Sequence, residues 1–431
     1  MEQKKFRALA FFLLTALLIL VIVVAVFLKA SWIFFTVLGI CTVLTLVIIV
    51  WVIIQQEKLS RNKEVTSFEK GSGLPTKFLY EELMVATDNF SSIVGQGGSG
   101  CVFRGILKDG TCIAVKRMEG QERGEKEFRA EVAAIGCVQH ANLVRVYGYC
   151  IIPKGPRFLV YEFVQNGSLD RWIFPREHDK KQLQGGCLPW KVRHQVAIDV
   201  ARALHYLHND CQSRILHLDV KPENILLDDN YRAIVSDFGL AKLMGKEESM
   251  VVTRIRGTRG YLAPEWILEK GVSAKTDVYS YGMLLLEMIG GRRNVLMLSC
   301  GDGKGKSTMP PDMQSWEYFP KTVFEKLKAG KIMEVVDKRL LEEGSVIDED
   351  ELRRLIYIAL WCIQEKVKIR PNMGQVVNML EGRLCVDEPP ETKMFLHDLL
   401  LLKTEKKAAL HISQPPNGKA PIVATTSSLY I

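Results

Sequence analysis

Two long apolar runs lie near the N-terminal end of the chain, and a mixed pattern of apolar and polar residues follows them. Residues 6–28 and 32–54 are almost free of charge, and three residues separate the two runs. A helix rises about 1.5 Å per residue, so each run is long enough to cross a bilayer. We therefore expect transmembrane helices at 6–28 and 32–54.

The first run has a second interpretation, as a signal sequence that is removed from the mature protein. Its length exceeds the roughly 7–15 apolar residues of a signal-peptide core, which favours two spans. Positive flanks favour the cytoplasmic side of a membrane. Both interpretations place the rest of the chain in the cytoplasm and leave almost no room outside for a ligand-binding domain. The basic flanking residues are Lys4, Lys5 and Arg7 before the pair and Lys58, Arg61 and Lys63 after it.

The rest of the chain changes its period once. Residues 55–76 are polar and contain the linker-like sequence KGSGLP, and a short helical pattern starts near Tyr80. From Ile93 to Val164 alternating apolar positions predict strands, with one helix around 122–138. From Leu188 onward a period of 3.6 predicts helices. A small strand-rich part followed by a larger helical part is expected, with a disordered tail after about residue 388.

Composition changes this picture little. The net charge is +8, but the basic residues are scattered among acids and form no stripe with interleaved aromatics. A nucleic-acid partner is therefore not expected. The 10 cysteines include no CxxC pair, so we expect reduced thiols in a cytosolic domain.

The first chemical motif is glycine-rich. The sequence VGQGGSGCV at 94–102 places Gly95, Gly97 and Gly100 in G-x-G-x-x-G spacing. Without a Cβ atom, glycine lets the backbone approach phosphate oxygens closely. A dinucleotide-binding loop would need a helix directly after the third glycine, whereas a strand, turn, strand pattern follows here. We expect a glycine-rich hairpin, with an ordinary turn as the alternative.

A lysine lies inside the next predicted strand. Lys116, in IAVKR, would be costly to bury unless its charge is met. Glu131 follows fifteen residues later in the helical stretch EFRAEVAAIG and could supply the carboxylate. The alternative is an edge-strand lysine that faces water.

Three further motifs follow in order: HLDVKPEN at 217–224, SDFG at 236–239 and YLAPEW at 261–266. With the two earlier motifs, this set resembles the catalytic domain of eukaryotic protein kinases. The stretches FLYEELMVATDNFS and FLVYEFVQNGSL resemble the plant receptor-like kinase branch, of a membrane-anchored type with almost no ectodomain. The resemblance implies an α+β, two-lobed kinase fold at 90–386, preceded by one or two transmembrane helices and a juxtamembrane linker at 55–89, and followed by a tail at 387–431.

The resemblance also implies roles for the charged residues around HLDVKPEN. Asp219 would accept the proton of a substrate hydroxyl, and Lys221 would lie against the transferring phosphate of ATP. Asn224 and Asp237 would hold Mg²⁺ through oxygen atoms, which suit a hard cation. Lys221, two residues after the base, resembles Ser/Thr kinases, and Thr258 would reach Asp219.

The nucleotide site implied by the resemblance combines the hairpin, the strand lysine and the segment between the lobes. Lys116, held by Glu131, would pair with the α and β phosphates, and the backbone of Glu162 and Val164 would meet the adenine edge. Tyr161 would stand at the back. The remaining residues implied for ATP are Val94, Gly95, Gln96, Gly97, Gly98, Ser99, Gly100, Cys101, Val102 and Ala114 above the nucleotide, and Leu226 below it.

Other implied contacts are structural. Glu265 would form a buried ion pair with Arg370, and Asp277 would bond the backbone near His217. Taken alone, Asp277 is better interpreted as a helix N-cap, and the two interpretations are compatible. An apolar stack of Phe238, His217 and Ile135 would link the lobes.

The sequence departs from the commonest kinase pattern at two positions. Leu218 replaces the arginine that normally pairs with a phosphate on the activation segment. This resembles the non-RD receptor kinases, so phosphorylation, for example at Thr253, is not expected to be an absolute switch. Ser99 replaces a frequent aromatic at the tip of the glycine loop, which predicts weaker nucleotide binding.

The leading interpretation is an active, membrane-anchored Ser/Thr kinase in signalling, at the plasma membrane with a cytoplasmic kinase domain. Its partners would be protein substrates, the bilayer, and a co-receptor or transmembrane partner. A pseudokinase scaffold is disfavoured, because Lys116, Glu131, Asp219, Asn224 and Asp237 are all present. A membrane hairpin module, with transmembrane contacts as its main function, remains a third alternative.

Overall fold

The structure is a computed structural model whose chain divides into two compact units, residues 1–74 and 75–431. Among the described residues, no helix is both long enough and apolar enough to cross a membrane. The predicted span at 6–28 and most of the span at 32–54 lie outside the described residues. The structure describes residues 39–40, 43–47, 51, 75–97, 100–118, 121–136, 138–153, 155–175, 186–245, 247–269, 271–298, 315–342, 346–392 and 394.

The N-terminal part of the second unit is a six-stranded sheet with the order β1-β5-β6-β4-β3-β2. β1 runs parallel to β5, and the other neighbours are antiparallel. The alternating pattern between Ile93 and Val164 is therefore confirmed as strands. Gly97 pairs with Gly100, which confirms the glycine-rich hairpin. The strands are β1 Thr76–Lys77, β2 Ile93–Gly97, β3 Gly100–Ile106, β4 Cys112–Met118, β5 Val146–Ile151 and β6 Arg157–Glu162.

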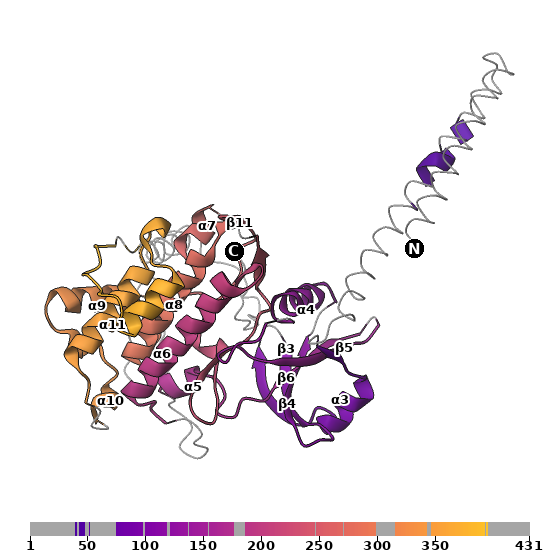
Figure 1. The fold of residues 1–431 in the computed structure, drawn as a ribbon, viewed down its shortest axis with the longest axis horizontal. Helices are drawn as coiled ribbons and strands as arrows, with labels where there is room; N and C mark the ends of the chain where they lie inside the picture. The colour runs from indigo at the N-terminus through magenta and orange to yellow at the C-terminus, as the bar shows by residue number, and fades with distance from the viewer. Residues whose placement is uncertain are drawn as a thin grey trace, which may run out of the picture. The chain divides into compact units, whose positions relative to one another are not determined.

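Two helices accompany this sheet (Figure 1). They are α3 (Tyr80–Ala86) and α4 (Gln121–Ile135). Leu83 of α3 is fully buried, and the Phe90 ring stacks on that of Phe158 in β6 with centroids 5.4 Å apart. The range predicted as a linker, 55–89, thus includes β1, which is a strand of the sheet, and α3, which packs against the sheet.

The C-terminal part is mainly helical, as the change of period predicted (Figure 1). Helix α8 is buried on every side from Thr276 to Ile289, and its apolar sequence explains why. It contacts α6, α9 and α11, and it is the centre of this lobe. The helices are α5 Asp170–Ile173, α6 Trp190–His205, α7 Pro264–Glu269, α8 Ala274–Gly290, α9 Phe319–Lys328, α10 Lys338–Glu342, α11 Glu349–Cys362 and α12 Met373–Leu380.

Short strand pairs lie among these helices. β7 pairs with β10, β8 with β9, β11 with β12, and β13 with β14. The chain between β7 and β8 is the stretch 217–224, so strands fix the charged motif at both ends. The bounds are β7 Arg214–Leu216, β8 Ile225–Leu227, β9 Ala233–Val235, β10 Lys242–Met244, β11 Val251–Val252, β12 Gly271–Val272, β13 Val295–Leu298 and β14 Ser315–Tyr318.

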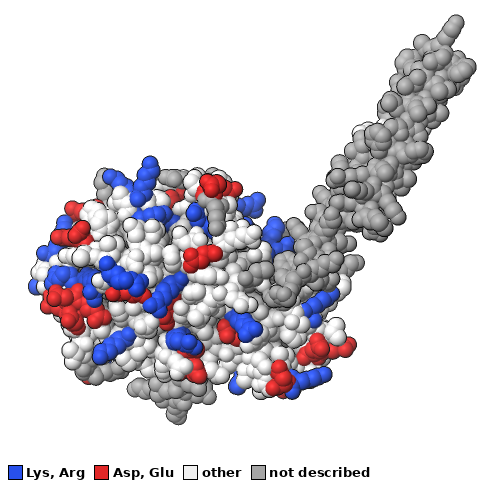
Figure 2. Space-filling view, viewed as in Figure 1, with Lys and Arg blue, Asp and Glu red and all other residues white. Residues whose placement is uncertain are grey.

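Charge is mixed on the visible surface. Figure 2 shows basic and acidic side chains interspersed over the face it presents. Two polar segments that contain glycine and proline, at 175–186 and 299–315, lie almost wholly outside the described residues, as does the tail after residue 394.

Candidate active site

The backbone of the loop at 217–224 is hydrogen-bonded to a buried carboxylate on α8. Asp277 accepts hydrogen bonds from the backbone N–H of His217 at 2.9 Å and of Leu218 at 2.7 Å. Nε2 of His208 lies 2.8 Å from the same carboxylate. Burial alone would raise the pKa of Asp277, but these donors outweigh it and lower that pKa. The carboxylate is therefore a fixed anion under the loop.

Asp277 is not the N-cap of its helix, so the N-cap interpretation was wrong. Ser273 caps α8, and its hydroxyl accepts a hydrogen bond from the N–H of Lys275 at 3.2 Å. Asp277 lies one turn further on, and its side chain bonds the loop instead of its own helix. A serine three residues before a polar residue is the local signal that competed with it.

Leu218 takes a left-handed backbone conformation, with φ of 64°, and its side chain is 3 % exposed. The side chain packs in an apolar cluster that joins the loop to the segment at 237–266. We call this the segment cluster. Its buried members are Leu216, Leu218, Met244, Trp266 and Val272, and Leu240, Val251, Ile255, Leu262 and Ala274 pack around them. Leu218 therefore holds the loop to this segment through aliphatic contacts.

The carboxylate of Asp219 is the meeting point of three side chains. Thr258 donates its hydroxyl to Oδ1 at 2.8 Å, and Lys221 Nζ donates to Oδ2 at 2.7 Å. Asn224 Nδ2 donates to the same Oδ2 at 2.9 Å and to the backbone carbonyl of Asp219 at 2.8 Å. Lys221 also donates to the Thr258 hydroxyl at 2.8 Å, so the expected reach of Thr258 is present.

Lys116 joins the sheet to two carboxylates. Its Nζ lies 2.9 Å from Glu131 Oε2 and 2.7 Å from Asp237 Oδ1. Glu131 also accepts hydrogen bonds from the Tyr161 hydroxyl and from the N–H of Phe238. The expected ion pair with Glu131 is present. The edge-strand alternative is wrong, because β4 lies between β3 and β6 and Lys116 is 6 % exposed.

The pKa values of the two acids beside Lys116 shift in opposite directions. Burial raises the pKa of Glu131, although Lys116 opposes that effect. Burial would also raise the pKa of Asp237, but Lys116 outweighs this effect and lowers the pKa of Asp237 to about 2. Burial would lower the pKa of Lys116, yet Asp237 and Glu131 together raise it. Asp237 is therefore ionised at neutral pH, beside a charged lysine.

Strand register brings the expected nucleotide residues to one face of the sheet. Val102 pairs with Lys116, and Ala114 pairs with Tyr161, so their side chains share that face. Val102, Ala114 and Val94 are half-buried, as is Leu226 in the other lobe. Cys101 is buried and alternates to the opposite face.

The glycine-rich hairpin is described only in part. Gly95 is half-buried, Gln96 and Gly97 are exposed, and Gly98 and Ser99 lie outside the described residues. Gly100 has a φ of 128°, and a Cβ atom there would lie 2.0 Å from the carbonyl oxygen of Arg117. This glycine is therefore required by the turn itself.

The site residues have oxygen atoms available for a hard cation. Asn224 uses its amide nitrogen on Asp219, and none of its described hydrogen bonds involves Oδ1. Asp237 carries an ionised carboxylate. No group of three His, Cys, Asp or Glu side chains arranged for a metal occurs in the described part of the chain. Mg²⁺ needs only one or two protein ligands when phosphates and water complete its shell, so the pair fits Mg²⁺.

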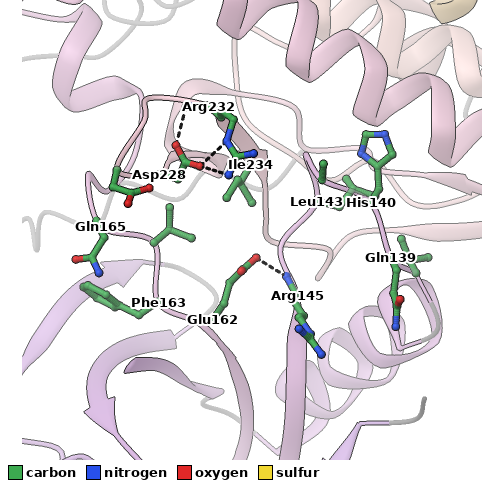
Figure 3. Close-up of a pocket in the computed structure, with 14 residues that line it drawn as sticks. Gln139, His140, Leu143, Arg145, Glu162, Phe163, Gln165, Asp228, Arg232 and Ile234 are labelled. Carbon is green, nitrogen blue, oxygen red and sulfur yellow. Dashed lines mark hydrogen bonds and ion pairs between the residues drawn. The ribbon is translucent and has the colours of Figure 1, made fainter. Parts of the chain in front are cut away.

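A pocket of about 680 Å³ lies against the segment that joins the lobes. Figure 3 shows the side chains of Glu162 and Arg145 at this pocket, with Asp228 and Arg232 across it. Glu162 accepts a hydrogen bond from the N–H of Arg145 at 2.8 Å. Val164 also lines this pocket. Its walls come from three segments distant in sequence. The sequence indicated Glu162 and Val164 but not this pocket, whose lining does not include Lys116, Asp219 or Asp237.

Two ion-pair groups support the site. Arg370 binds Glu265 through two hydrogen bonds of 2.8 Å each, and the expected buried pair is present.

The ring centroids of His217 and Phe238 lie 4.8 Å apart, as expected. The side chain of Ile135 lies outside the described residues.

The second group was not predicted from the sequence. Arg293 pairs with Glu223 at 2.5 Å and donates to the Tyr261 hydroxyl at 2.9 Å. Tyr261 in turn donates to Glu287. The only signal was an arginine pair after α8, which on its own is typical of solvated surface.

Comparison with known proteins places this arrangement in a family. Residues 89–379 match the family described as protein kinase domain. A probable receptor-like protein kinase of Arabidopsis thaliana is 52 % identical over 417 residues, which cover 93 % of this chain and 90 % of that protein. A G-type lectin S-receptor-like serine/threonine-protein kinase of the same plant is 48 % identical over 331 residues, 77 % of this chain.

The lectin-type relatives are much longer than this chain. The match covers 38 % of the Arabidopsis protein. A related kinase of this type from Oryza sativa subsp. indica is 42 % identical over 326 residues, which cover 74 % of this chain and 37 % of that protein. The chain therefore spans less than two fifths of the length of these relatives. Whatever the remaining parts of those proteins bind is a property of those proteins. The family match covers more than half of the chain, and the chain belongs to the protein kinase family, among the receptor-like kinases of plants.

Proposed function

We propose that this chain is a membrane-anchored receptor-like kinase that transfers the γ-phosphate of ATP to serine and threonine hydroxyls of proteins. The observation that carries the proposal is the Asp219 carboxylate, held by Thr258, Lys221 and Asn224 within 2.9 Å. A carboxylate fixed by three donors from two segments is positioned to orient an incoming hydroxyl. Phosphoryl transfer depends mostly on such positioning and on charge neutralisation.

Each residue then has a defined part. Asp219 orients the substrate hydroxyl and accepts its proton. Lys221, which bonds Asp219, neutralises charge on the transferring phosphate. Lys116 pairs with the α and β phosphates while Glu131 holds its ammonium in place. Asn224 and Asp237 hold Mg²⁺, which supplies positive charge to the phosphate oxygens when it is bound.

The adenine and ribose end would use the shared face of the sheet. Val102 and Ala114 cover the ring and Leu226 supports it, because all three are apolar and only half-buried. The backbone of Glu162 and Val164 meets the adenine edge. The glycine-rich residues 94–101 approach the phosphates through their backbone.

The acceptor is proposed to be Ser or Thr. Lys221 and Thr258 bridge the base at 2.7 and 2.8 Å, and this pair is typical of kinases that phosphorylate aliphatic hydroxyls. The names of the lectin-type relatives, which include serine/threonine-protein kinase, support this acceptor.

The competing function is a pseudokinase scaffold that binds partners without transfer. It is disfavoured because the side chains needed for transfer are all present and bonded to one another, as Lys116 is to Asp237. Transfer of labelled γ-phosphate from MgATP to a mixture of Ser and Thr peptides separates the two functions. We expect incorporation by wild type, a loss of at least about a hundredfold for Asp219→Asn, and no loss for the exposed Asp350→Asn. Equal incorporation by wild type and Asp219→Asn would rule out the proposed chemistry.

Membrane anchoring is proposed from the runs at 6–28 and 32–54 and from the receptor-like names of the relatives. The plasma membrane, a cytoplasmic kinase domain and a co-receptor or transmembrane partner belong to the same proposal. Extraction of the full chain from membranes by alkaline carbonate, with deletion of 1–54 as the control, tests it. Release of the full chain without detergent would contradict the anchor.

The number of spans follows from protease protection of tags at the two ends of the chain. Purification without any associated chain would contradict the proposed co-receptor or transmembrane partner.

A further inference from the structure

Arg293 connects four parts of the C-terminal lobe. Its guanidinium pairs with Glu223 at 2.5 Å, donates to the Tyr261 hydroxyl at 2.9 Å, and lies 4.0 Å from the ring centroid of Phe174. Its other neighbour is Glu287 of α8, at 3.8 Å. A guanidinium with two acceptors, one aromatic face and a second acid nearby is held in one place.

These contacts lie beside the base. Glu223 belongs to the short 3₁₀ turn Pro222–Asn224, whose last residue donates to Asp219. Tyr261 follows Thr258, which also donates to Asp219, and its N–H bonds the carbonyl of Thr258 at 3.2 Å. Arg293 therefore bridges the two segments that hold the Asp219 carboxylate.

The pair is also accessible. The side chains of Glu223 and Arg293 are 36 % and 37 % exposed. A peptide whose hydroxyl approached Asp219 would pass next to them. Unpaired, the Glu223 carboxylate would attract a basic side chain of such a peptide; paired with Arg293, it carries no net charge to offer.

Removal of Arg293 would expose one negative charge and not two. Burial raises the pKa of Glu287 to about 7, and Arg293 is among the groups that restrain this rise. Glu287 is also 2 % exposed, so its carboxyl is not accessible to a peptide whether or not Arg293 is present. The charge that appears is then that of Glu223, whose Oε1 loses Arg293 as its partner, while its Oε2 is buried and has no hydrogen-bond partner in the described part of the chain.

We propose that Arg293 is a specificity-determining residue that occupies the acidic position of Glu223, so that this kinase does not select protein substrates carrying Arg or Lys beside the phosphorylated residue. The inference rests on the proposed Ser/Thr kinase function. It concerns which hydroxyls are chosen and not how the phosphate is transferred.

The test is a set of serine peptides in which each flanking position in turn carries Arg, Glu or Gln, assayed by kcat/KM with the full chain. Arg293→Met keeps an unbranched stem against Phe174 and removes the charge, and Arg293→Lys keeps the charge. We expect Arg293→Met to gain a preference for Arg over Gln of about two- to fivefold at one flanking position, the size of an exposed ion pair. Arg293→Lys should behave as wild type.

Glu223→Gln should change the charge preference of the kinase in the opposite direction. It removes the closest carboxylate from Arg293 and leaves only the buried Glu287 at 3.8 Å, so a preference for Glu over Gln of similar size should appear at that same position. The double variant Glu223→Gln/Arg293→Met should show neither preference. Since each preference is a ratio within one variant, a general loss of activity through the Tyr261 contact does not affect it.

The inference is overturned if Arg293→Met is folded and active but keeps the wild-type preferences, or if its new preference survives Glu223→Gln. Should Arg293→Met melt below the assay temperature, Glu223→Gln decides alone, and no gain for acidic peptides overturns the inference. Wild type that phosphorylates no peptide above the Asp219→Asn level would instead defeat the proposed function, which keeps the two failures apart.

Discussion

The ammonium of Lys116 lies 2.9 Å from the Glu131 carboxylate, and this contact ties strand β4 to helix α4. The same ammonium lies 2.7 Å from Asp237, which is the first residue of the other lobe's long segment at 237–266. One buried cation therefore sets the relative position of the sheet, the helix and the proposed metal ligand. Because the ammonium has no other hydrogen-bond or ion-pair partner among the described residues, loss of either carboxylate leaves its charge poorly compensated.

Glu131→Gln should weaken nucleotide use more than folding. The amide keeps the shape and can still meet Tyr161, but Lys116 is left with Asp237 alone and shifts toward it. We expect kcat/KM for ATP to fall about 10- to 100-fold, because the proposed phosphate contact depends on this ion pair. Steady-state kinetics with varied ATP measure the effect. Glu125→Gln is the control, because this half-buried residue of α4 forms ion pairs with Arg129 and Arg157 and not with Lys116. A Glu131→Gln enzyme with unchanged kcat/KM would contradict the proposed role.

Thr253→Ala should leave most of the activity in place. The segment cluster packs the region around β11 through Leu218 and Val251, so we expect order there to be independent of an arginine and a phosphate. We expect turnover within about threefold of wild type, in contrast to kinases whose segment is ordered by phosphorylation. Turnover of the purified variant, with Asp219→Asn as the inactive reference, measures it. Near-complete loss of activity would show that phosphorylation at Thr253 is an absolute switch.

Leu218→Ala, in contrast, should affect both stability and activity. Truncation of a leucine that is 3 % exposed removes packing in the segment cluster and leaves a cavity. The expected loss is about 2–5 kcal/mol of unfolding free energy, with reduced turnover because the loop carries Asp219. Urea denaturation and kinetics check both. Leu341→Ala is the matched exposed control, at 44 % exposure, and an equal effect of the two substitutions would contradict the role of the cluster.

Arg370→Met should destabilise the helical lobe strongly. Its guanidinium is buried and makes two hydrogen bonds to Glu265, so removal of one partner leaves a buried carboxylate without a counter-charge. We expect a loss of about 3–5 kcal/mol by chemical denaturation. The exposed pair Arg353 and Glu349 supplies the control, since Arg353→Met should cost less than about 0.5 kcal/mol. Similar losses for the two substitutions would refute the distinction.

Glu287 should make stability depend on pH. Burial raises the pKa of this carboxyl from 4.5 to about 7 in the folded protein, so the folded state binds its proton more tightly than the unfolded state does. Stability is then highest below pH 4.5 and falls as pH rises to about 7, by about 3 kcal/mol for this group. Urea denaturation of wild type and Glu287→Gln at several pH values isolates the contribution. The variant should lose less stability over this range, and parallel curves would disprove the assignment.

The sequence by itself determined the elements and the chemical groups. Alternation placed the strands between Ile93 and Val164, and the fully apolar stretch in α8 predicted a buried helix, because periods of 2 and 3.6 are properties of short segments. The motif at 217–224 named Asp219, Lys221 and Asn224. Short-range spacing carries such information whatever the rest of the chain does.

Tertiary structure decided which distant groups meet. Lys116 and Asp237 are 121 positions apart, and Glu223 and Arg293 are 70 positions apart. Neither contact has a local pattern, since each exists only because packed lobes bring two segments together. The same reason explains Asp277. Its sequence position near the start of α8 suggested a helix cap, whereas in the fold the loop backbone lies within 2.9 Å of its carboxylate.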